Sequence, residues 1–274
     1  MKTLLFLLIT YISLSFSDTT LCTTNAKRYG SQLGVPTSIP DFCKDVLVNS
    51  KTFSFSDDNS VKAFGIKNLL YIKLFNSSQP EPLLIKDHFI AGSNTSLSNI
   101  LSIQISIKHK RVFVLNESQE GVSVLSFFYD VGGNLSPARK LISSKLLNVT
   151  KFQLSESQDE IFVFNSGGAE INVFHINADL NGKRPENSIE PIRSFSLGGL
   201  GLGDTLFSTF NKEYFYIVTS DYLVIIDKSF CKQNLIKISH KGIEKSSKTN
   251  LRFTGNVVSI LVDAKVHSSY QLDN

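Results

Sequence analysis

Apolar and polar residues alternate over short stretches along most of the chain, and turn-forming residues separate these stretches. The clearest example is residues 159–177, DEIFVFNSGGAEINVFHIN, where two alternating runs flank a Gly-Gly pair. Alternation over five or six residues is typical of half-buried β-strands, and Gly-Gly between two such runs indicates a hairpin. Outside the N-terminus, no long segment has the apolar period of a helix. The pattern therefore predicts an all-β fold.

The hairpin belongs to a sequence repeat. Shifted by 49 positions, residues 159–182 align without a gap on residues 110–133, with Phe162 over Phe113 and Gly182 over Gly133. Weaker copies extend the repeat in both directions, and a hydroxyl residue marks the end of the first strand in each copy. These anchors are Ser56, Ser106, Ser155, Ser208 and Thr254, spaced 50, 49, 53 and 46 residues apart. A repeat of this length is typical of radial β architectures.

Each copy reads as four short strands. In the third copy we expect them at Phe152–Ser155, Ile161–Asn165, Ile171–Ile176 and Ile192–Leu197. Four strands in about 40–50 residues form the blade of a β-propeller. We therefore predict a β-propeller of about five four-stranded blades over residues 45–274, or alternatively an incomplete or degenerate seven-bladed propeller. The last copy ends after its third strand, and residues 45–49 (DVLVN) are expected to supply its outer strand.

The repeat also resembles a known family of motifs. An apolar-Ser start, a Val-Phe-Val strand, an Ile-Asn-Val-Phe strand and an Asp-x-x-Gly turn are similar to the lactonase-type (YVTN-like) β-propeller repeats, most clearly over residues 103–183. The resemblance implies a propeller fold. Some members hydrolyse sugar lactones and many are binding or structural proteins, commonly with seven blades. No catalytic residue of the family matches a position here, so none is carried over.

The N-terminus indicates export. Residues 1–17 (MKTLLFLLITYISLSFS) have a basic start, a short apolar run and small residues before Asp18, as in a cleaved secretory signal peptide, with an uncleaved anchor as the alternative. We expect a secreted, extracellular protein (periplasmic in a bacterium) without a membrane span. Residues 18–44 are rich in Gly and Pro, and in an oxidising compartment Cys22 and Cys43 are candidates for a disulfide. Cys231 would remain a free thiol.

Glycosylation motifs are frequent. Asn-X-Ser/Thr sequons predict N-glycosylation at four candidate residues in a eukaryotic secreted protein. These are Asn76, Asn94, Asn116 and Asn148. A fifth sequon, at Asn134, is followed by Pro137, which makes it a poorer acceptor. In a bacterium the sequons would carry no such meaning.

Candidate chemistry is sparse. The five histidines fall at different phases of the repeat, and the turn Asn177–Gly182 lacks the full ligand set of a calcium loop. The Gly-rich stretch Leu197–Asp204 lacks a phosphate-binding spacing and is predicted to link two blades. Lys228–Arg252 is basic, but its charges are spaced as on a solvated strand edge. No metal or cofactor is predicted, and a net charge of +4 does not indicate a nucleic-acid partner.

Two functional hypotheses follow. The first is a secreted β-propeller that acts as a binding module, with a protein or glycan ligand at its rim loops or central pocket, because such a scaffold holds many loops in fixed positions. The alternative is a lactonase-like hydrolase that acts on a small sugar lactone. A degenerate propeller with a structural role is a third hypothesis. The residues alone do not decide whether the protein is catalytic.

Overall fold

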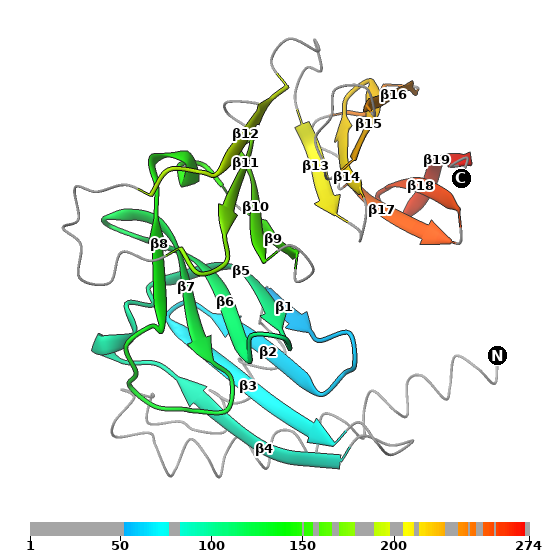
Figure 1. Cartoon of the computed structure of the whole chain (residues 1–274). Coiled ribbons are helices and arrows are strands. Elements are labelled where there is room, and N and C mark those ends of the chain that lie inside the picture. Colours follow the sequence, from blue (N-terminus) through cyan, green and yellow to red (C-terminus); the bar gives the residue numbers. More distant parts are fainter. Residues whose placement is uncertain are drawn as a thin grey trace. The chain divides into compact units, whose positions relative to one another are not determined.

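The structure is a computed structural model, and Figure 1 shows it as a cartoon. It describes residues 52–76, 83–149, 151–155, 159–165, 170–178, 189–197, 205–210, 214–227, 235–240, 242–244, 249–254 and 256–271. The predicted signal peptide, the segment with Cys22 and Cys43, and the expected strand at residues 45–49 lie outside the described residues. Cys231 and most of the Gly-rich stretch 197–204 lie outside them as well.

The described part of the chain is all-β. Its strands are arranged as consecutive antiparallel sheets (Figure 1), and no α-helix occurs within the ranges given above. Two single-turn 3-10 helices, η1 (Ser93–Thr95) and η2 (Ser144–Leu146), lie in connections. Alternating side chains with many Val, Ile and Phe residues favour strands, because β-branched and aromatic side chains pack well on a pleated surface.

Each sheet is a meander of strands that follow one another in the sequence. The first sheet contains β1 (Thr52–Phe55), β2 (Val61–Ile66), β3 (Leu69–Asn76) and β4 (Leu83–Ile90). The second contains β5 (Asn99–Ser106), β6 (Arg111–Ser118), β7 (Gly121–Phe128) and β8 (Arg139–Ile142). The third contains β9 (Phe152–Ser155), β10 (Glu160–Asn165), β11 (Glu170–His175) and β12 (Arg193–Ser196).

The last two sheets follow the same plan. The fourth contains β13 (Thr205–Phe210), β14 (Tyr214–Thr219), β15 (Tyr222–Asp227) and β16 (Leu235–Ser239). The fifth contains the three strands β17 (Thr249–Thr254), β18 (Val257–Val262) and β19 (Lys265–Gln271). The predicted all-β chain of about five blades is thereby confirmed, and the strands of the third copy lie within one or two residues of their predicted positions.

The hydroxyl anchors of the repeat organise the turn between the first and second strand of a sheet. Ser56, Ser106 and Ser155 are all buried. Ser56 Oγ accepts a hydrogen bond from Val61 N at 2.9 Å, and Ser106 Oγ accepts one from His109 N at 3.1 Å. The three turns also share a left-handed residue before the second strand: Asn59 (φ 56°), Lys110 (φ 51°) and Asp159 (φ 55°). The repeat is therefore a repeat of turn chemistry as well as of strands.

The chain divides into two compact units, each considered by itself. The first comprises residues 1–160 and 175–190, and the second comprises residues 161–174 and 191–274. In the first unit, apolar side chains of β2 and β3 pack against those of β5, β6 and β7. In the second unit, one cluster joins β10, β11, β14 and β15, and another joins β14, β15 and β18. These clusters bury the apolar face of each sheet, which stabilises the fold.

The meander places the connections of a sheet at two opposite ends. Because neighbouring strands are antiparallel, the turn between strands one and two lies at the same end as the connection that leaves strand three. In the second sheet we call this the A–B end, and it carries the turn 107–110 between β5 and β6. The other end, which we call the B–C end, carries the turn between β6 and β7 and the connection from β4 to β5.

Candidate functional site

Four consecutive basic residues stand at the A–B end of the second sheet. Lys108, His109 and Lys110 form the turn, and Arg111 begins β6. The backbone amide of His109 donates to the buried Ser106 hydroxyl, and this hydrogen bond holds the turn in place. Lys108 and Lys110 are exposed, whereas His109 and Arg111 are half-buried. We call these four residues the basic turn.

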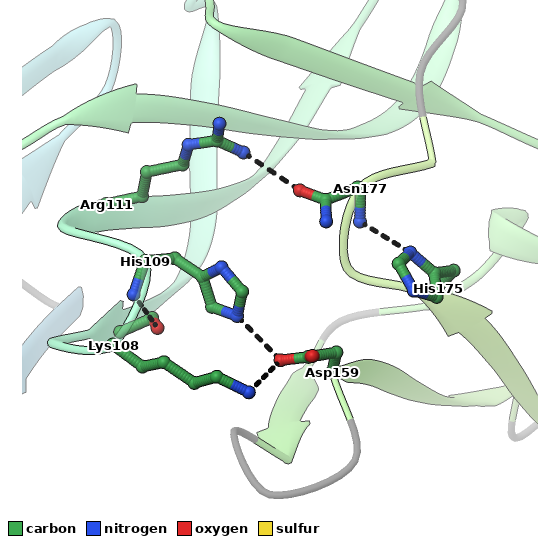
Figure 2. Close-up of polar contacts among 7 residues, drawn as sticks. Lys108, His109, Arg111, Asp159, His175 and Asn177 are labelled. Carbon is green, nitrogen blue, oxygen red and sulfur yellow. Dashed lines mark hydrogen bonds and ion pairs between the residues drawn. The ribbon is translucent and has the colours of Figure 1, made fainter.

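One carboxylate faces the basic turn. Lys108 Nζ lies 2.6 Å from Asp159 Oδ1, and His109 Nε2 lies 2.8 Å from the same oxygen (Figure 2). Asp159 occupies the corresponding turn of the repeat and is itself left-handed, with φ 55°. The hydrogen bond from Lys108, followed by the one from His109, holds the pKa of Asp159 below its usual value. Asp159 is therefore a carboxylate at neutral pH.

Arg111 extends the basic turn towards a second segment. Its guanidinium carbon lies 5.2 Å from the centre of the Phe128 ring, and 45% of Phe128 is exposed. Arg111 Nη1 donates to Asn177 Oδ1 at 3.4 Å, and Asn177 N donates to His175 Nδ1 at 3.1 Å (Figure 2). The contact with Phe128 and the hydrogen bond to Asn177 together fix the direction of the guanidinium.

The cluster has an excess of positive charge. Lys108, Lys110 and Arg111 carry three positive charges, and among the described residues Asp159 is the carboxylate that pairs with Lys108 and His109. Its ion pairs are open to water, since 48% of the Lys108 side chain and 35% of the Asp159 side chain are exposed. Exposed pairs of this kind exchange partners at little cost, so an incoming anion can replace Asp159 at Lys108.

This cluster was not predicted from the sequence. Four consecutive basic residues are a visible signal in the sequence, but the basic segment considered there is the longer stretch Lys228–Arg252. Much of that stretch lies outside the described residues. Within its described part, Lys237 Nζ sits 3.8 Å above the centre of the Tyr222 ring, in agreement with a lysine that covers a strand edge. Asp159 and Asn177 join the basic turn only through packing, which no local pattern shows.

The candidate glycosylation sites differ in their surroundings. Asn94 and Asn148 are exposed, and Asn76 is half-buried at the end of β3. Asn116 is 1% exposed, its Nδ2 donates to Ser96 O at 3.1 Å, and its Oδ1 accepts from Ser98 N at 2.8 Å. In the folded chain Asn116 Nδ2 is buried and hydrogen-bonded, so a glycan would have to be attached before this loop closes, and glycosylation at Asn116 stays a prediction.

Three structural findings concern other predicted or possible sites. Residues 179–182 of the predicted turn after β11 lie outside the described residues. Among the residues with a described placement, no group of three or more His, Cys, Asp or Glu residues could hold a metal ion. In the same part of the chain, no helix is long and apolar enough to cross a membrane.

Two further histidine environments were not predicted from the sequence. His88 is 3% exposed, and neither ring nitrogen makes a hydrogen bond of good geometry to a described residue. Burial, followed by the charge of Lys86, lowers the pKa of His88 to about 4. The rings of His240 and His267, 27 residues apart in the sequence, meet edge to face with centroids 5.7 Å apart. The position of a histidine within the repeat predicts neither of these environments.

Comparison with known proteins gives resemblance in fold. No protein-family model matches the chain, and no curated protein matches it. Similar solved structures include the periplasmic gluconolactonase PpgL of Pseudomonas aeruginosa, with 14% identity, a TM-score of 0.48, and coverage of 78% of this chain and 65% of that one. Hsv2 of Kluyveromyces lactis has 13% identity, a TM-score of 0.41, and coverage of 71% and 62%.

A third similar structure is a functionally unknown protein of Desulfotomaculum acetoxidans, with 11% identity, a TM-score of 0.48, and coverage of 80% of this chain and 69% of that one. The chain spans less than two thirds of the PpgL and Hsv2 structures. A gluconolactonase is thus among the solved structures to which the chain is similar.

Proposed function

We propose that the protein is a secreted binding module that recognises anionic groups of its ligand through the basic turn. The observation that carries the proposal is the run Lys108–Arg111, held on a fixed turn at one end of a sheet, with Asp159 paired to Lys108 and His109. A rigid sheet that presents a one-sign turn is a suitable recognition element, because little ordering of the chain is needed on binding.

The residues of the basic turn differ in how their side chains are held. Lys108 is bound to Asp159 in water-exposed surroundings, where ion pairs are weak, so it can transfer to a ligand. Arg111 is oriented by Phe128 and Asn177 and adds a positive charge at a fixed position beside the two lysines. Lys110 is exposed and adds charge without a fixed geometry.

Sulfated oligosaccharide is the probe that tests this proposal. Binding should weaken as salt concentration rises. Lys108→Gln and Lys110→Gln should each lower affinity roughly fivefold, as expected for a loss of about 1 kcal/mol. Lys67→Gln is the matched control, because Lys67 is exposed and left-handed (φ 49°), like Lys110 (φ 51°), but lies in the turn between β2 and β3. Equal losses for Lys67 and Lys110 would show that binding follows net charge alone and would overturn the proposal.

Secretion is tested separately. We expect the protein recovered from the medium of a secreting host to begin at Asp18, which N-terminal sequencing would show. Mass spectrometry under non-reducing conditions should find a peptide that joins Cys22 to Cys43. Intracellular retention of the full chain, with its first residues intact, would contradict the secretory part of the proposal and leave the binding part standing.

The lactonase-like alternative has one observation in its favour. A histidine hydrogen-bonded to a carboxylate, as His109 is to Asp159 at 2.8 Å, is an arrangement used in general-base catalysis. However, the same Asp159 oxygen also binds Lys108, and the side chain of His109 has no hydroxyl or thiol partner among the described residues. The alternative predicts hydrolysis of glucono-lactone that is lost in both His109→Gln and Asp159→Asn. Hydrolysis at the uncatalysed rate would exclude it.

A further inference from the structure

The second sheet changes character along one of its faces. On β6, the face that packs against the first sheet presents Val112 and Val114, and then Asn116. On the paired strand β7, Leu125 lies opposite Val114, and Ser123 lies opposite Asn116. Directly opposed residues of antiparallel strands share a face. An apolar face therefore becomes polar as it approaches the B–C end.

A cavity of about 380 Å³ opens where this face becomes polar. It lies between the connection 96–98 and the β6–β7 hairpin, in the first unit. Four serines line it, together with two amide residues, one acidic residue and one lysine, and glycine and three aliphatic residues complete the wall. The lining residues are Ser96, Leu97, Ser98, Asn116, Ser118, Gln119, Glu120, Gly121, Val122, Ser123, Lys140 and Ile142.

Internal hydrogen bonds hold the walls of this cavity. Asn116 binds the backbone of Ser96 and Ser98, at 3.1 and 2.8 Å, and so fixes the connection 96–98. Ser118 Oγ donates to Gly121 O at 3.2 Å and accepts from Glu120 N at 3.2 Å, and so fixes the hairpin. A polar cavity with walls that are already ordered needs little rearrangement to receive a ligand.

The third sheet provides an internal comparison. Its residue at the position of Ser123 in the repeat is Asn172, which is fully buried. There Asn172 Oδ1 accepts from Ser194 Oγ at 2.6 Å, and Asn172 Nδ2 donates to Glu170 Oε2 at 3.2 Å. Ser123 is only 6% exposed, and its hydroxyl binds no described residue. The polar position is satisfied internally in the third sheet and left open to the cavity in the second.

We propose that this cavity binds a small neutral ligand that carries several hydroxyl groups, of the size of a simple sugar. The open hydroxyls of Ser96, Ser98 and Ser123 and the amide of Gln119 can both donate to and accept from such a ligand. This site lies at the opposite end of the sheet from the basic turn and does not depend on it.

The charges of the lining favour a neutral ligand. Glu120 and Lys140 balance one another and stand 3.7 Å apart, with 82% and 28% of their side chains exposed. An anion would be attracted by Lys140 but repelled by Glu120. A cation would be attracted by Glu120 but repelled by Lys140. The exposed portions of the half-buried Val122 and Ile142 can contact the C–H groups that a sugar also carries. A hydrocarbon ligand would leave the serine hydroxyls without partners, which is costly.

Glucose, galactose and N-acetylglucosamine are suitable probes, with sulfate as the anionic comparison. We expect at least one sugar to shift backbone amide NMR signals of residues 96–98 and 118–123, with roughly millimolar affinity for so small a ligand. Ser123→Ala should weaken binding roughly three- to tenfold, as for a lost hydrogen bond. Ser126→Ala is the matched control, because Ser126 is a buried serine on the same strand outside the cavity lining.

Gln119→Ala gives a second reading, since Gln119 is exposed on the hairpin and its loss should leave the fold intact. This substitution should weaken binding of the same sugar by a similar factor. The proposal is overturned if none of the three sugars shifts these signals, or if sulfate alone shifts them. It is also overturned if Ser123→Ala and Gln119→Ala bind as the unaltered protein does.

Discussion

His88 should make the protein sensitive to mild acid. It lies in β4 beneath Gly132, where a methyl group on the glycine would come within 2.8 Å of the His88 side chain. Burial and the nearby Lys86 charge lower the pKa of His88 to about 4, and the opposing effects of Asp130 and of backbone groups at residues 129 and 131 are smaller. Protonation of His88 therefore opposes the folded packing.

The size of the effect follows from the two pKa values. An unfolded histidine takes up a proton near pH 6.5, whereas folded His88 does so only near pH 4. Between these values the unfolded state binds more protons, so stability falls as the pH falls. At about 1.4 kcal/mol for each pH unit, the full interval corresponds to roughly 3 kcal/mol. The loss is absent above the unfolded value and complete below the folded one.

Urea unfolding of the unaltered protein and of His88→Phe would measure this difference. Between about pH 7 and about pH 4.5, the free energy of unfolding should fall by roughly 2–3 kcal/mol more in the unaltered protein than in His88→Phe. Carboxylates that titrate in the same range contribute equally to both proteins. His175→Phe, at an exposed site, controls for the removal of an imidazole. An NMR titration of the His88 ring in the unaltered protein reads the pKa directly.

Two results would refute the reasoning. One is an equal acid dependence in the unaltered protein and His88→Phe. The other is an NMR pKa for His88 close to 6.5, which would mean that the ring is reached by water and that its burial does not act on its charge.

Four stability changes should follow from turns and loops, all measurable by urea unfolding at neutral pH. Gly121→Ala should cost about 1–2 kcal/mol through its left-handed φ of 112° alone, because a methyl group there meets nothing within 4 Å. Gly92→Ala has a similar φ of 114° but places Cβ 2.5 Å from Asn134 Cγ, so it should cost more; equal losses would contradict this. Asn116→Ala should cost about 1–3 kcal/mol through the loss of two part-buried hydrogen bonds to the connection 96–98. Ser106→Ala should cost about 1 kcal/mol through loss of the hydrogen bond from His109 N to the serine hydroxyl. An unchanged urea midpoint would show that this hydroxyl does not stabilise the turn.

The strands were predictable because their signals are local. Alternation, turn residues and the 49-residue shift located β9 to β12 closely, and the anchor serines were visible because each one acts within its own turn. The first copy was harder to read, since Gly65 and Lys62 interrupt the apolar pattern of β2, yet this strand pairs fully with β3. Pairing with a strongly apolar neighbour compensates for a weak pattern.

The candidate sites depended on contacts that sequence does not encode locally. His109 and Asp159 are 50 residues apart and meet only because corresponding turns of successive repeats come together. The cavity arises where Asn116 and Ser123 stand opposite each other at positions that alternation assigns to the core. Both residues are polar in the sequence, but only the strand register shows that they share a face.

Asn116 has a consequence for the biosynthesis of the protein. Its Nδ2 atom closes the connection 96–98, and the same atom is the one that a glycan would occupy in the sequon Asn116-Glu-Ser. In a host that glycosylates exported chains, a molecule modified there before folding cannot close this loop, and a molecule that folds first has hidden the acceptor. Glycan occupancy at Asn116 therefore records which event came first, and the modified fraction would be the misfolded one.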